Sequence, residues 1–439
     1  MLTSTAFSAI LILICLFLFV FLCLKGVNPV MIGLLCGAIM SVVCLSGFTT
    51  GLFTTFVGGI SSTVSSTLFP FMSGAFVGGM MSVSGCSTTM GNLLMKHTSR
   101  KAAPWIIIIF TCIMNLTGMS STMYVVAAFA IAVLRAADMP LEIGLICAGG
   151  FNMVIAWAMP GFIGFTNSIL CDLYGTDTFA GLGVSIPMTV VGIVLTLWYL
   201  FYIMKKYDKQ GRHFEDSPTL PKLQELKDGE GPSPAFGFLS IVIVIVVAMF
   251  LQYVVEISAS NAVVIGQTAG GLFILVTCGK YIQGSMLGQI TDSVQRAFIP
   301  VMAMGFVTGF ANVVADTNAY QAVMNAFTNM NLNPYVGVVL VTSVIVALCA
   351  NGISCIMILM QNGITQQFMV EGVNAGVLHA LTRTTCACLD TLPHSANVIL
   401  NLSCFGLDYK KGYKHCFVTT VLIPGIMVLV GLAIAVIFY

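Results

Sequence analysis

Long apolar stretches, each bounded by a few polar residues, follow one another along the whole chain. A helix needs about 20 apolar residues to cross a bilayer, and the clearest runs are residues 6–24, 28–46, 64–83 and 183–204. The first run is similar to a signal peptide, but no small-residue cleavage site follows it before the next run. We therefore predict an all-α polytopic membrane protein whose first span is residues 6–24.

One stretch, residues 205–235, has the charge, proline and glycine content of a soluble linker. The apolar halves on either side share sequence blocks in the same order: Pro70 recurs 230 positions later as Pro300, and a segment beginning at Asn28 recurs at Asn261. Internal repeats of this kind indicate duplicated architecture. The pattern predicts a first repeat at residues 1–204, a linker at 205–235 and a second repeat at 236–439.

The distribution of basic residues indicates that the repeats are inverted. The loop at residues 84–103 contains three lysines and arginines, whereas its counterpart at 314–333 contains none. Cytoplasmic loops are enriched in lysine and arginine, so equivalent loops are expected on opposite sides of the membrane. We expect the linker to be cytoplasmic, both termini to lie outside, and the protein to lie in the plasma (inner) membrane.

Two stretches are expected to form re-entrant helical hairpins. Residues 104–135 are interrupted at Gly118–Thr122, are too short for two full spans of about 20 residues, and are flanked by Lys101 and Arg135, which the charge pattern assigns to one side. Residues 335–369 form the mirror stretch, with a tip at Asn351–Ser354. Such interrupted segments at matching places in two halves are typical of transporter sites.

Each half also contains a broken transmembrane helix. In the first half the break is at Pro160 and Gly161, with Asn152, Thr166 and Asn167 as the polar residues nearby. The break in the second half, from Leu389 to Ser395, also contains ionisable groups, which are costly inside a bilayer and mark substrate or ion pathways. The first break keeps the proline without those groups, which favours a small substrate with one acidic group.

Each ionisable residue at the second break could have either of two roles. Asp390 and His394 could relay a proton or orient the substrate. Arg383, two helical turns before Asp390, could bind a substrate carboxylate or neutralise Asp390. We predict proton coupling by Asp390 and His394. The predicted substrate-binding residues are Ser120, Ser121, Thr122, Asn152, Asn351, Gly352, Ser354, Arg383, His394 and Asn397.

The segment Leu389-Asp-Thr-Leu-Pro-His-Ser395 and the downstream Phe405-Gly-Leu-Asp-Tyr-Lys-Lys-Gly-Tyr413 resemble the gluconate permease family and its hydroxybutyrate permease members. The resemblance is close over residues 375–425 and loose elsewhere; for example, Ala380 stands where the family typically has arginine. It implies an ion-transporter fold with inverted repeats, proton-coupled uptake of sugar acids and hydroxy acids, and a homodimer. It also implies that one domain of each subunit, here residues 104–182 and 335–409, moves against a fixed scaffold.

Composition narrows the function classes further. Of the 439 residues, 58% are hydrophobic and only 8% are charged, against about 25% charged in soluble proteins. A net charge of +1 gives no basic surface for nucleic acid, and the cysteines lack metal-ligand spacing, so we expect neither metal nor cofactor. The sequence predicts a secondary transporter that imports a small organic carboxylate with protons. The alternatives are Na⁺ coupling, a channel, or an intramembrane enzyme that uses Asp390 and His394.

Overall fold

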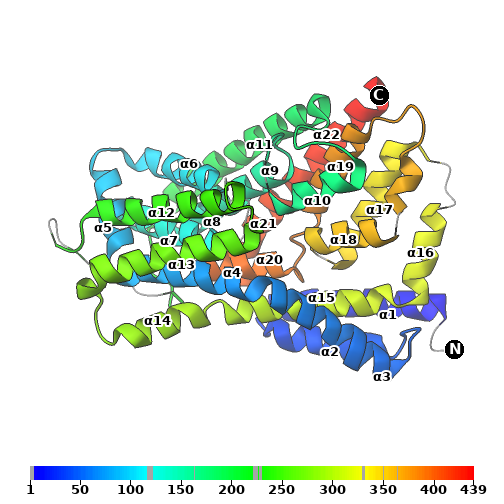
Figure 1. Cartoon of the computed structure of the whole chain (residues 1–439), viewed down its shortest axis with the longest axis horizontal. Coiled ribbons are helices and arrows are strands. Elements are labelled where there is room, and N and C mark those ends of the chain that lie inside the picture. Colours follow the sequence, from blue (N-terminus) through cyan, green and yellow to red (C-terminus); the bar gives the residue numbers. More distant parts are fainter. Residues whose placement is uncertain are drawn as a thin grey trace.

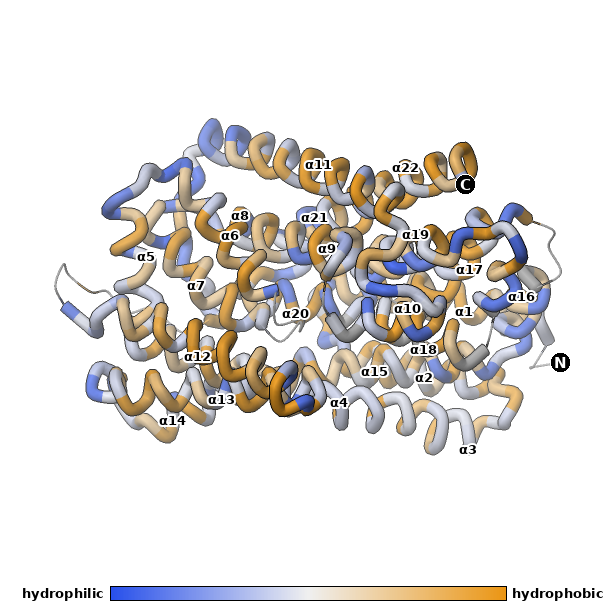
Figure 2. The backbone as a smooth tube through the Cα atoms, turned by 45° about the horizontal axis from the view of Figure 1, so that its top comes forward, coloured by the Kyte–Doolittle hydropathy of each residue, from blue (hydrophilic) through white to orange (hydrophobic). Residues whose placement is uncertain are grey.

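The computed structural model describes residues 4–115, 122–162, 164–220, 226, 230–328, 332–349, 351–362 and 364–439. These residues form helices and connecting segments and contain no strand. Seven helices among them are long and apolar enough to cross a membrane. The backbone is hydrophobic through most of its length, and hydrophilic residues gather at its two ends (Figure 2). The prediction of an all-α, multi-pass membrane protein is confirmed.

The first half contains eleven helices before the linker within the described residues. They are α1 (Thr5–Leu24), α2 (Pro29–Ser41), α3 (Phe48–Thr50), α4 (Val57–Val83), α5 (Cys86–Lys96), α6 (Ala103–Asn115), α7 (Met123–Ala136), α8 (Leu141–Leu145), α9 (Phe151–Trp157), α10 (Phe165–Tyr174) and α11 (Leu182–Lys209). Helix α4 continues directly from a π-helical segment, Gly51–Phe56, and a second π-helical segment, Ile146–Gly150, joins α8 to α9.

The second half contains a further eleven helices in the part of the chain that the structure covers. They are α12 (Pro234–Tyr253), α13 (Ala259–Cys278), α14 (Met286–Gln295), α15 (Phe298–Ala315), α16 (Asn318–Thr328), α17 (Pro334–Cys349), α18 (Gly352–Asn362), α19 (Ala375–Cys388), α20 (Ala396–Cys404), α21 (Tyr409–Phe417) and α22 (Ile423–Phe438). Side-chain caps fix several starts: Asn374 accepts from the N–H of Val377, and Asp408 accepts from that of Lys411.

Helices α4 and α15 run side by side along much of the molecule (Figure 1). They approach closely because glycines face each other: a Cβ on Gly59 would lie 2.7 Å from the Cα of Gly309. Small residues at such contacts let helix backbones pack tightly in a membrane. Helices α1 and α2 pack near one end of this pair, and α12 and α13 pack near the other.

Two helical hairpins occupy the stretches where the sequence predicts them. Helices α6 and α7 pack on each other with the rings of Phe110 and Phe129 4.1 Å apart, and α17 packs on α18. At 1.5 Å per residue, the 13 residues of α6 measure about 20 Å, which is shorter than the roughly 30 Å hydrocarbon core. The first tip, predicted at Gly118–Thr122, lies outside the described residues except for Thr122. Re-entry into the bilayer stays a prediction.

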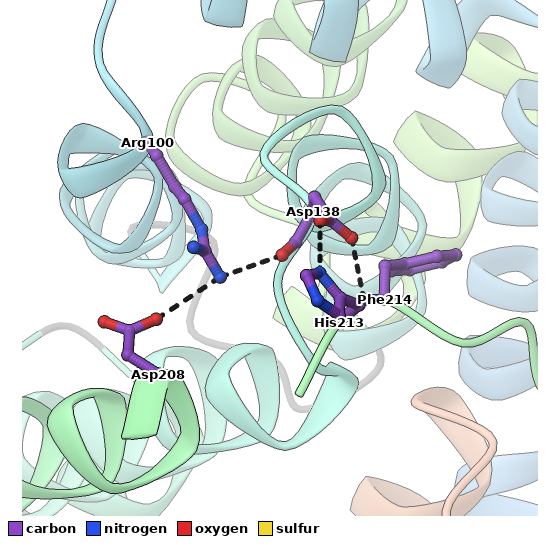
Figure 3. A network of polar contacts seen from close by, with 5 residues as sticks. All are labelled: Arg100, Asp138, Asp208, His213 and Phe214. Carbon is purple, nitrogen blue, oxygen red and sulfur yellow. Dashed lines mark hydrogen bonds and ion pairs between the residues drawn. The ribbon is translucent and has the colours of Figure 1, made fainter. Parts of the chain in front are cut away.

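The start of the linker is held at one end of the molecule by a polar network (Figure 3). The Arg100 guanidinium donates to the backbone carbonyl of Asp138 at 3.0 Å and lies 3.4 Å from Asp208. The His213 ring lies 2.6 Å from the Asp138 carboxylate, and this contact holds the pKa of Asp138 below its ordinary value. The loop after α5, the turn after α7 and the linker therefore share one end, here called the linker end. Its side of the membrane stays a prediction.

Candidate functional site

Both predicted helix breaks are present and lie close together. Helix α9 ends at Trp157 and α10 begins at Phe165, with Pro160 between them. Helix α19 ends at Cys388 and α20 begins at Ala396, with Pro393 between them. Helix α19 packs against both α9 and α10, so the two breaks face the same region of the interior. A broken helix inside a membrane protein exposes backbone groups that must find partners or line a cavity.

At the second break, Asp390 is 1% exposed and its carboxylate accepts two hydrogen bonds. The backbone N–H of Gly352, the first residue of α18, donates to Oδ1 at 2.9 Å. The side-chain amide of Asn397, in the first turn of α20, donates to Oδ2 at 2.8 Å. Among the described residues the carboxylate forms no ion pair with a lysine, arginine or histidine.

The helix starts around Asp390 explain how a buried carboxylate is tolerated there. A helix N-terminus carries a partial positive charge and unpaired N–H groups, which stabilise an anion. Asp390 occupies this position at α18, and the side chain of Asn397 adds a donor from the start of α20. Two half-helices from different parts of the second half thus converge on one carboxylate. This arrangement supplies hydrogen bonds without supplying a full positive charge.

The first break is held by side chains of α19. The Arg383 guanidinium donates to the carbonyl of Met159 at 2.5 Å and to Oδ1 of Asn167 at 3.2 Å. The Thr384 hydroxyl donates to the carbonyl of Trp157 at 3.0 Å. These carbonyls are available because the helix stops at Trp157. Arg383 therefore lies on the first break, and the described residues contain no ion pair between Arg383 and Asp390.

Asn167 links the first break to a second position on α19. Its side-chain oxygen lies 2.9 Å from Nε2 of His379, while its amide donates to the carbonyl of Phe162 at 2.8 Å. The other ring nitrogen of His379 lies 2.7 Å from the Thr176 hydroxyl. Both nitrogens of this histidine are thus engaged in holding α10 against α19. That contact is structural and leaves His379 without an evident role in substrate binding.

A cavity of about 130 Å³ lies between the two breaks and the α4–α15 pair. Its polar lining consists mainly of side-chain amides and one carboxylate. The polar residues are Ser66, Thr67, Asn115, Asn152, Thr166, Asn351, Asp390, Asn397 and Asn401. No lysine, arginine or histidine is among the lining residues that the structure describes. We refer to it below as the central cavity.

The central cavity brings together four of the residues that the sequence predicts for the site: Asn152, Asn351, Asp390 and Asn397. Gly352 contacts it indirectly, through its N–H bond to Asp390. Thr122 is buried outside the lining, and Ser120 and Ser121 lie outside the described residues. Ser354 lies in the first turn of α18, and its side chain is not among those described.

His394 lies away from the central cavity. Its ring is 3% exposed and packs edge-on against Phe19 of α1, with ring centroids 5.8 Å apart. The backbone of Ala347 approaches the ring, but neither ring nitrogen has a partner with hydrogen-bond geometry among the described residues. Among the hydrogen bonds of the described residues, none joins His394 to Asp390. The proposed proton relay between the two stays a prediction.

Two asparagines of the lining lie beyond the predicted set. Asn115 is the last residue of α6, and Asn401 lies one turn after Asn397 on α20. The amide of Asn401 donates to the carbonyl of Asn397 at 2.8 Å, and its buried oxygen has no partner among the described residues. Spacing could have indicated Asn401, because residues four apart share a helix face. Asn115 directly precedes the predicted hairpin tip.

Comparisons with known proteins give a distant relative and a set of structural neighbours. No family model matches the chain. The Uncharacterized transporter YxjC of Bacillus subtilis (strain 168) is 21% identical over 393 residues, which cover 81% of this chain and 83% of that protein. The YdaH transporter of Alcanivorax borkumensis shares 13% identity over 96% of this chain and 97% of its own, with a TM-score of 0.45. MtrF of Neisseria gonorrhoeae is described with a class of antimetabolite efflux pumps. It shares 12% sequence identity with this chain over 90% of this chain and 85% of its own, with a TM-score of 0.41.

Proposed function

We propose that this protein is a secondary transporter that imports a small organic carboxylate by proton symport. One observation carries the proposal: the described lining of a small cavity at the junction of two broken helices contains one carboxylate, that of the buried Asp390, and no lysine, arginine or histidine. Broken helices that meet near the middle of a membrane protein are the usual location of a transporter site. The distant relative named as a transporter supports the same function class.

The charge of the cavity favours coupling to a cation. An anionic substrate placed beside an ionised Asp390 would bring two like charges together in a site with low dielectric. A proton on Asp390 removes that repulsion and turns the carboxyl into a hydrogen-bond donor. Substrate and proton therefore favour each other's binding, which is the requirement for symport. The same linkage releases both together when the site opens to the other side.

The lining indicates the kind of substrate. Side-chain amides donate and accept hydrogen bonds, so the asparagines around the cavity suit both a carboxylate and a hydroxyl group. A volume of about 130 Å³ is below the roughly 300–1,000 Å³ of pockets for drug-sized ligands, so the cavity favours a small ligand. A small hydroxy acid fits these limits, in line with the resemblance to gluconate and hydroxybutyrate permeases.

Sodium coupling is the second candidate, because the oxygens around Asp390 also suit a hard cation. Asn351, Asn397 and Asn401 can each offer a side-chain carbonyl oxygen, and Asp390 adds a carboxylate. Oxygen ligands of this kind are preferred by alkali and alkaline-earth cations. In this version Na⁺ takes the place of the proton and neutralises Asp390 directly.

An uptake assay separates these versions. Purified protein is reconstituted into proteoliposomes, and uptake of labelled 3-hydroxybutyrate and gluconate is measured under a proton gradient alone or a Na⁺ gradient alone. We expect accumulation of at least one acid with the proton gradient. Accumulation that requires Na⁺ and ignores the proton gradient would establish the second candidate. Conversion of the acid to another compound, without its crossing the bilayer, would instead indicate an enzyme.

The position of the cavity suggests how access alternates. The central cavity lies between the α4–α15 pair and the segments that contain the hairpins and breaks. We propose that residues 104–182 and 335–409 move against the α4–α15 pair, as an elevator. A cross-link between Cys residues introduced at Thr67 and Asn401, which both line the cavity, should block transport. Full transport by the cross-linked protein would rule out this motion.

A further inference from the structure

A second cavity, of about 370 Å³, lies between the central cavity and the linker end. It is lined by residues of α4, α7, α15 and α20, and by Thr219 and Leu220 of the linker. The linker is held nearby, because the Ser217 hydroxyl donates to the carbonyl of Gly406 at 2.6 Å. The proposed function assigns no role to this cavity, which we call the linker-end cavity.

The two cavities occupy successive positions along the same helices. On α4 the lining passes from Phe71 in the central cavity to Ala75 in the linker-end cavity. On α7 it passes from Met123 to Tyr124. The rings of Phe71 and Tyr124 meet edge-to-face with centroids 6.0 Å apart. This aromatic pair lies where the two cavities adjoin, so the linker-end cavity continues the path that begins at Asp390.

The linker-end cavity contains a cation, unlike the central cavity. Arg296, between α14 and α15, is partly buried and lines it, and no aspartate or glutamate is among its described lining residues. Asp292, one turn earlier, contributes an electrostatic attraction to Arg296 without an ion pair within 4.0 Å in the described chain. Among the described residues the Arg296 guanidinium has no hydrogen-bond acceptor, so its N–H donors are available to a ligand in the cavity.

Tyr124 supplies a second group that lacks a partner. The side chain of Tyr124 lines the same cavity, and its hydroxyl is buried with no hydrogen-bond partner among the described residues. A buried hydroxyl without a partner costs roughly 1–3 kcal/mol relative to a bonded one. Such a group is retained more readily where a ligand completes its hydrogen bonding. Tyr124 and Arg296 line one cavity, and a tyrosine hydroxyl together with a guanidinium is a donor set that suits a carboxylate.

We propose that Arg296 and Tyr124 form a second carboxylate-binding site, which the substrate occupies between the central cavity and the linker end. This inference rests on the proposed function for the identity of its ligand. Arg296 binds the carboxylate with two parallel N–H groups, and Tyr124 donates its hydroxyl from the side of the central cavity. Substrate that leaves the central cavity thus meets a positive charge on its way out. The site lowers the barrier to transfer because it offers the anion an intermediate position.

A two-sided transport assay tests the site. Labelled 3-hydroxybutyrate or gluconate, whichever the wild type transports, is presented at either face of proteoliposomes. The orientation of the protein is determined by protease cleavage of the linker from outside. For Arg296→Gln we expect the KM at the linker end to rise about tenfold, as for loss of a charged hydrogen bond. Tyr124→Phe should raise it about threefold. Arg296→Lys, which keeps the charge but loses the paired donors, should fall between wild type and Arg296→Gln.

Lys280→Gln is the matched control, since it removes a positive charge that precedes α14 but does not line the cavity. It should leave both KM values unchanged. Equal KM values for Arg296→Gln and wild type at the linker end would overturn the proposal. An equal rise for Lys280→Gln would also overturn it, because the effect would then come from general surface charge.

A labelling experiment tests the charge in the cavity without requiring transport. Ser403 lines the linker-end cavity and is exposed, so Ser403→Cys provides a reactive thiol there. Its rates of reaction with an anionic sulfonate and a cationic trimethylammonium methanethiosulfonate are compared, with the parent chain as background. Arg296→Gln should lower the anionic-to-cationic rate ratio about fivefold.

The transport assay and the labelling experiment test different parts of the proposal, so one can fail while the other succeeds. If the wild type transports neither acid, the proposed substrate class is wrong, while the rate ratio at Ser403→Cys still reports whether Arg296 attracts anions. A ratio that is unchanged by Arg296→Gln would overturn the second site even in a protein that transports. Protection of the introduced thiol by 3-hydroxybutyrate, lost in Arg296→Gln, would add direct support for binding at this position.

Discussion

The two helix breaks, one in each half, have opposite polar chemistry. At the first break the helix ends leave backbone carbonyls, those of Trp157 and Met159, and the side chains of Thr384 and Arg383 donate to them. At the second break the central group is a carboxylate, Asp390, which receives N–H groups from the start of α18 and from Asn397. One break presents acceptors to a cation, and the other presents an anion to a helix N-terminus.

This difference assigns different tasks to the two breaks. The groups at the first break are backbone carbonyls, which cannot change charge, and a guanidinium, which remains charged under ordinary conditions. The carboxylate at the second break can gain and lose a proton or bind a cation. We therefore propose that coupling belongs to the second break, and that the first break holds the shape of the cavity against it. A proline lies in each break, so the prolines do not decide the difference in chemistry.

The largest effect is expected from removing the group that can change charge. Asp390→Asn keeps an oxygen that can accept from the Gly352 N–H but cannot exchange a proton, so uptake should equilibrate without accumulating the acid. Exchange of internal for external acid should persist. Accumulation and exchange of labelled 3-hydroxybutyrate in proteoliposomes measure the two separately. Asp177→Asn, which removes a carboxylate from an exposed loop, is the control and should accumulate normally. Full accumulation by Asp390→Asn would remove Asp390 from coupling.

The second effect tests whether the two breaks are mechanically joined. A Cβ on Gly352 would lie 2.5 Å from Cη2 of Trp157, the residue at which the first break begins. Gly352→Ala should therefore displace either the indole or the N–H that Asp390 accepts, and lower uptake severalfold. Trp157→Phe removes the atoms that clash, so the double variant should recover part of the loss. Uptake rates of the four proteins form a double-mutant cycle. Additive effects would mean that the breaks act independently.

Sequence reasoning located the breaks and hairpins, because prolines, glycines and charges are rare inside an apolar span unless the helix breaks or turns there. It could not establish the partner of Arg383. A spacing of seven residues would place Arg383 and Asp390 on nearly the same face of a continuous helix, but α19 ends at Cys388, so Asp390 lies beyond the last turn. Beyond the end of α19, spacing along the sequence no longer determines the direction in which a side chain points. The partners of Arg383 come from the first half, more than 200 positions earlier.

The asparagines illustrate the same limit. Asn152, Asn351 and Asn397 are next to the breaks or tips, so their position along the chain already predicts a place near the cavity. Asn115 and Asn401 lie within helices, and whether their side chains face the cavity depends on how those helices pack. The facing of α6 is set by its packing on α7 and α9, and that of α20 by its packing on α15, α21 and α7, which the apolar pattern does not specify. Tertiary packing therefore determines that Asn115 and Asn401 belong to the lining of the cavity.

A third, intermediate effect is expected from the cation at the first break. Arg383→Met removes two hydrogen bonds and leaves the Met159 carbonyl without this donor, which should lower stability by about 2 kcal/mol. Arg383→Lys keeps the charge but cannot reproduce the forked geometry, so its loss should be smaller. Thermal unfolding of both variants in detergent measures the difference. If Arg383→Met were as stable as wild type but failed to bind 3-hydroxybutyrate, Arg383 would be a substrate ligand and the first break would not depend on it.

The smallest effect is expected from removing a single hydroxyl group at the first break. Thr384 and Thr385 are neighbours on α19, and both are 1% exposed. The Thr384 hydroxyl lies within hydrogen-bond distance of the Trp157 carbonyl and of the Ala380 carbonyl on its own helix, whereas the Thr385 hydroxyl has no partner among the described residues. Valine has nearly the shape of threonine, so Thr384→Val should cost about 1 kcal/mol and Thr385→Val should be neutral or stabilising. Equal melting temperatures for the two variants would show that the Trp157 carbonyl does not need this donor, and the first break would then rest on Arg383 alone.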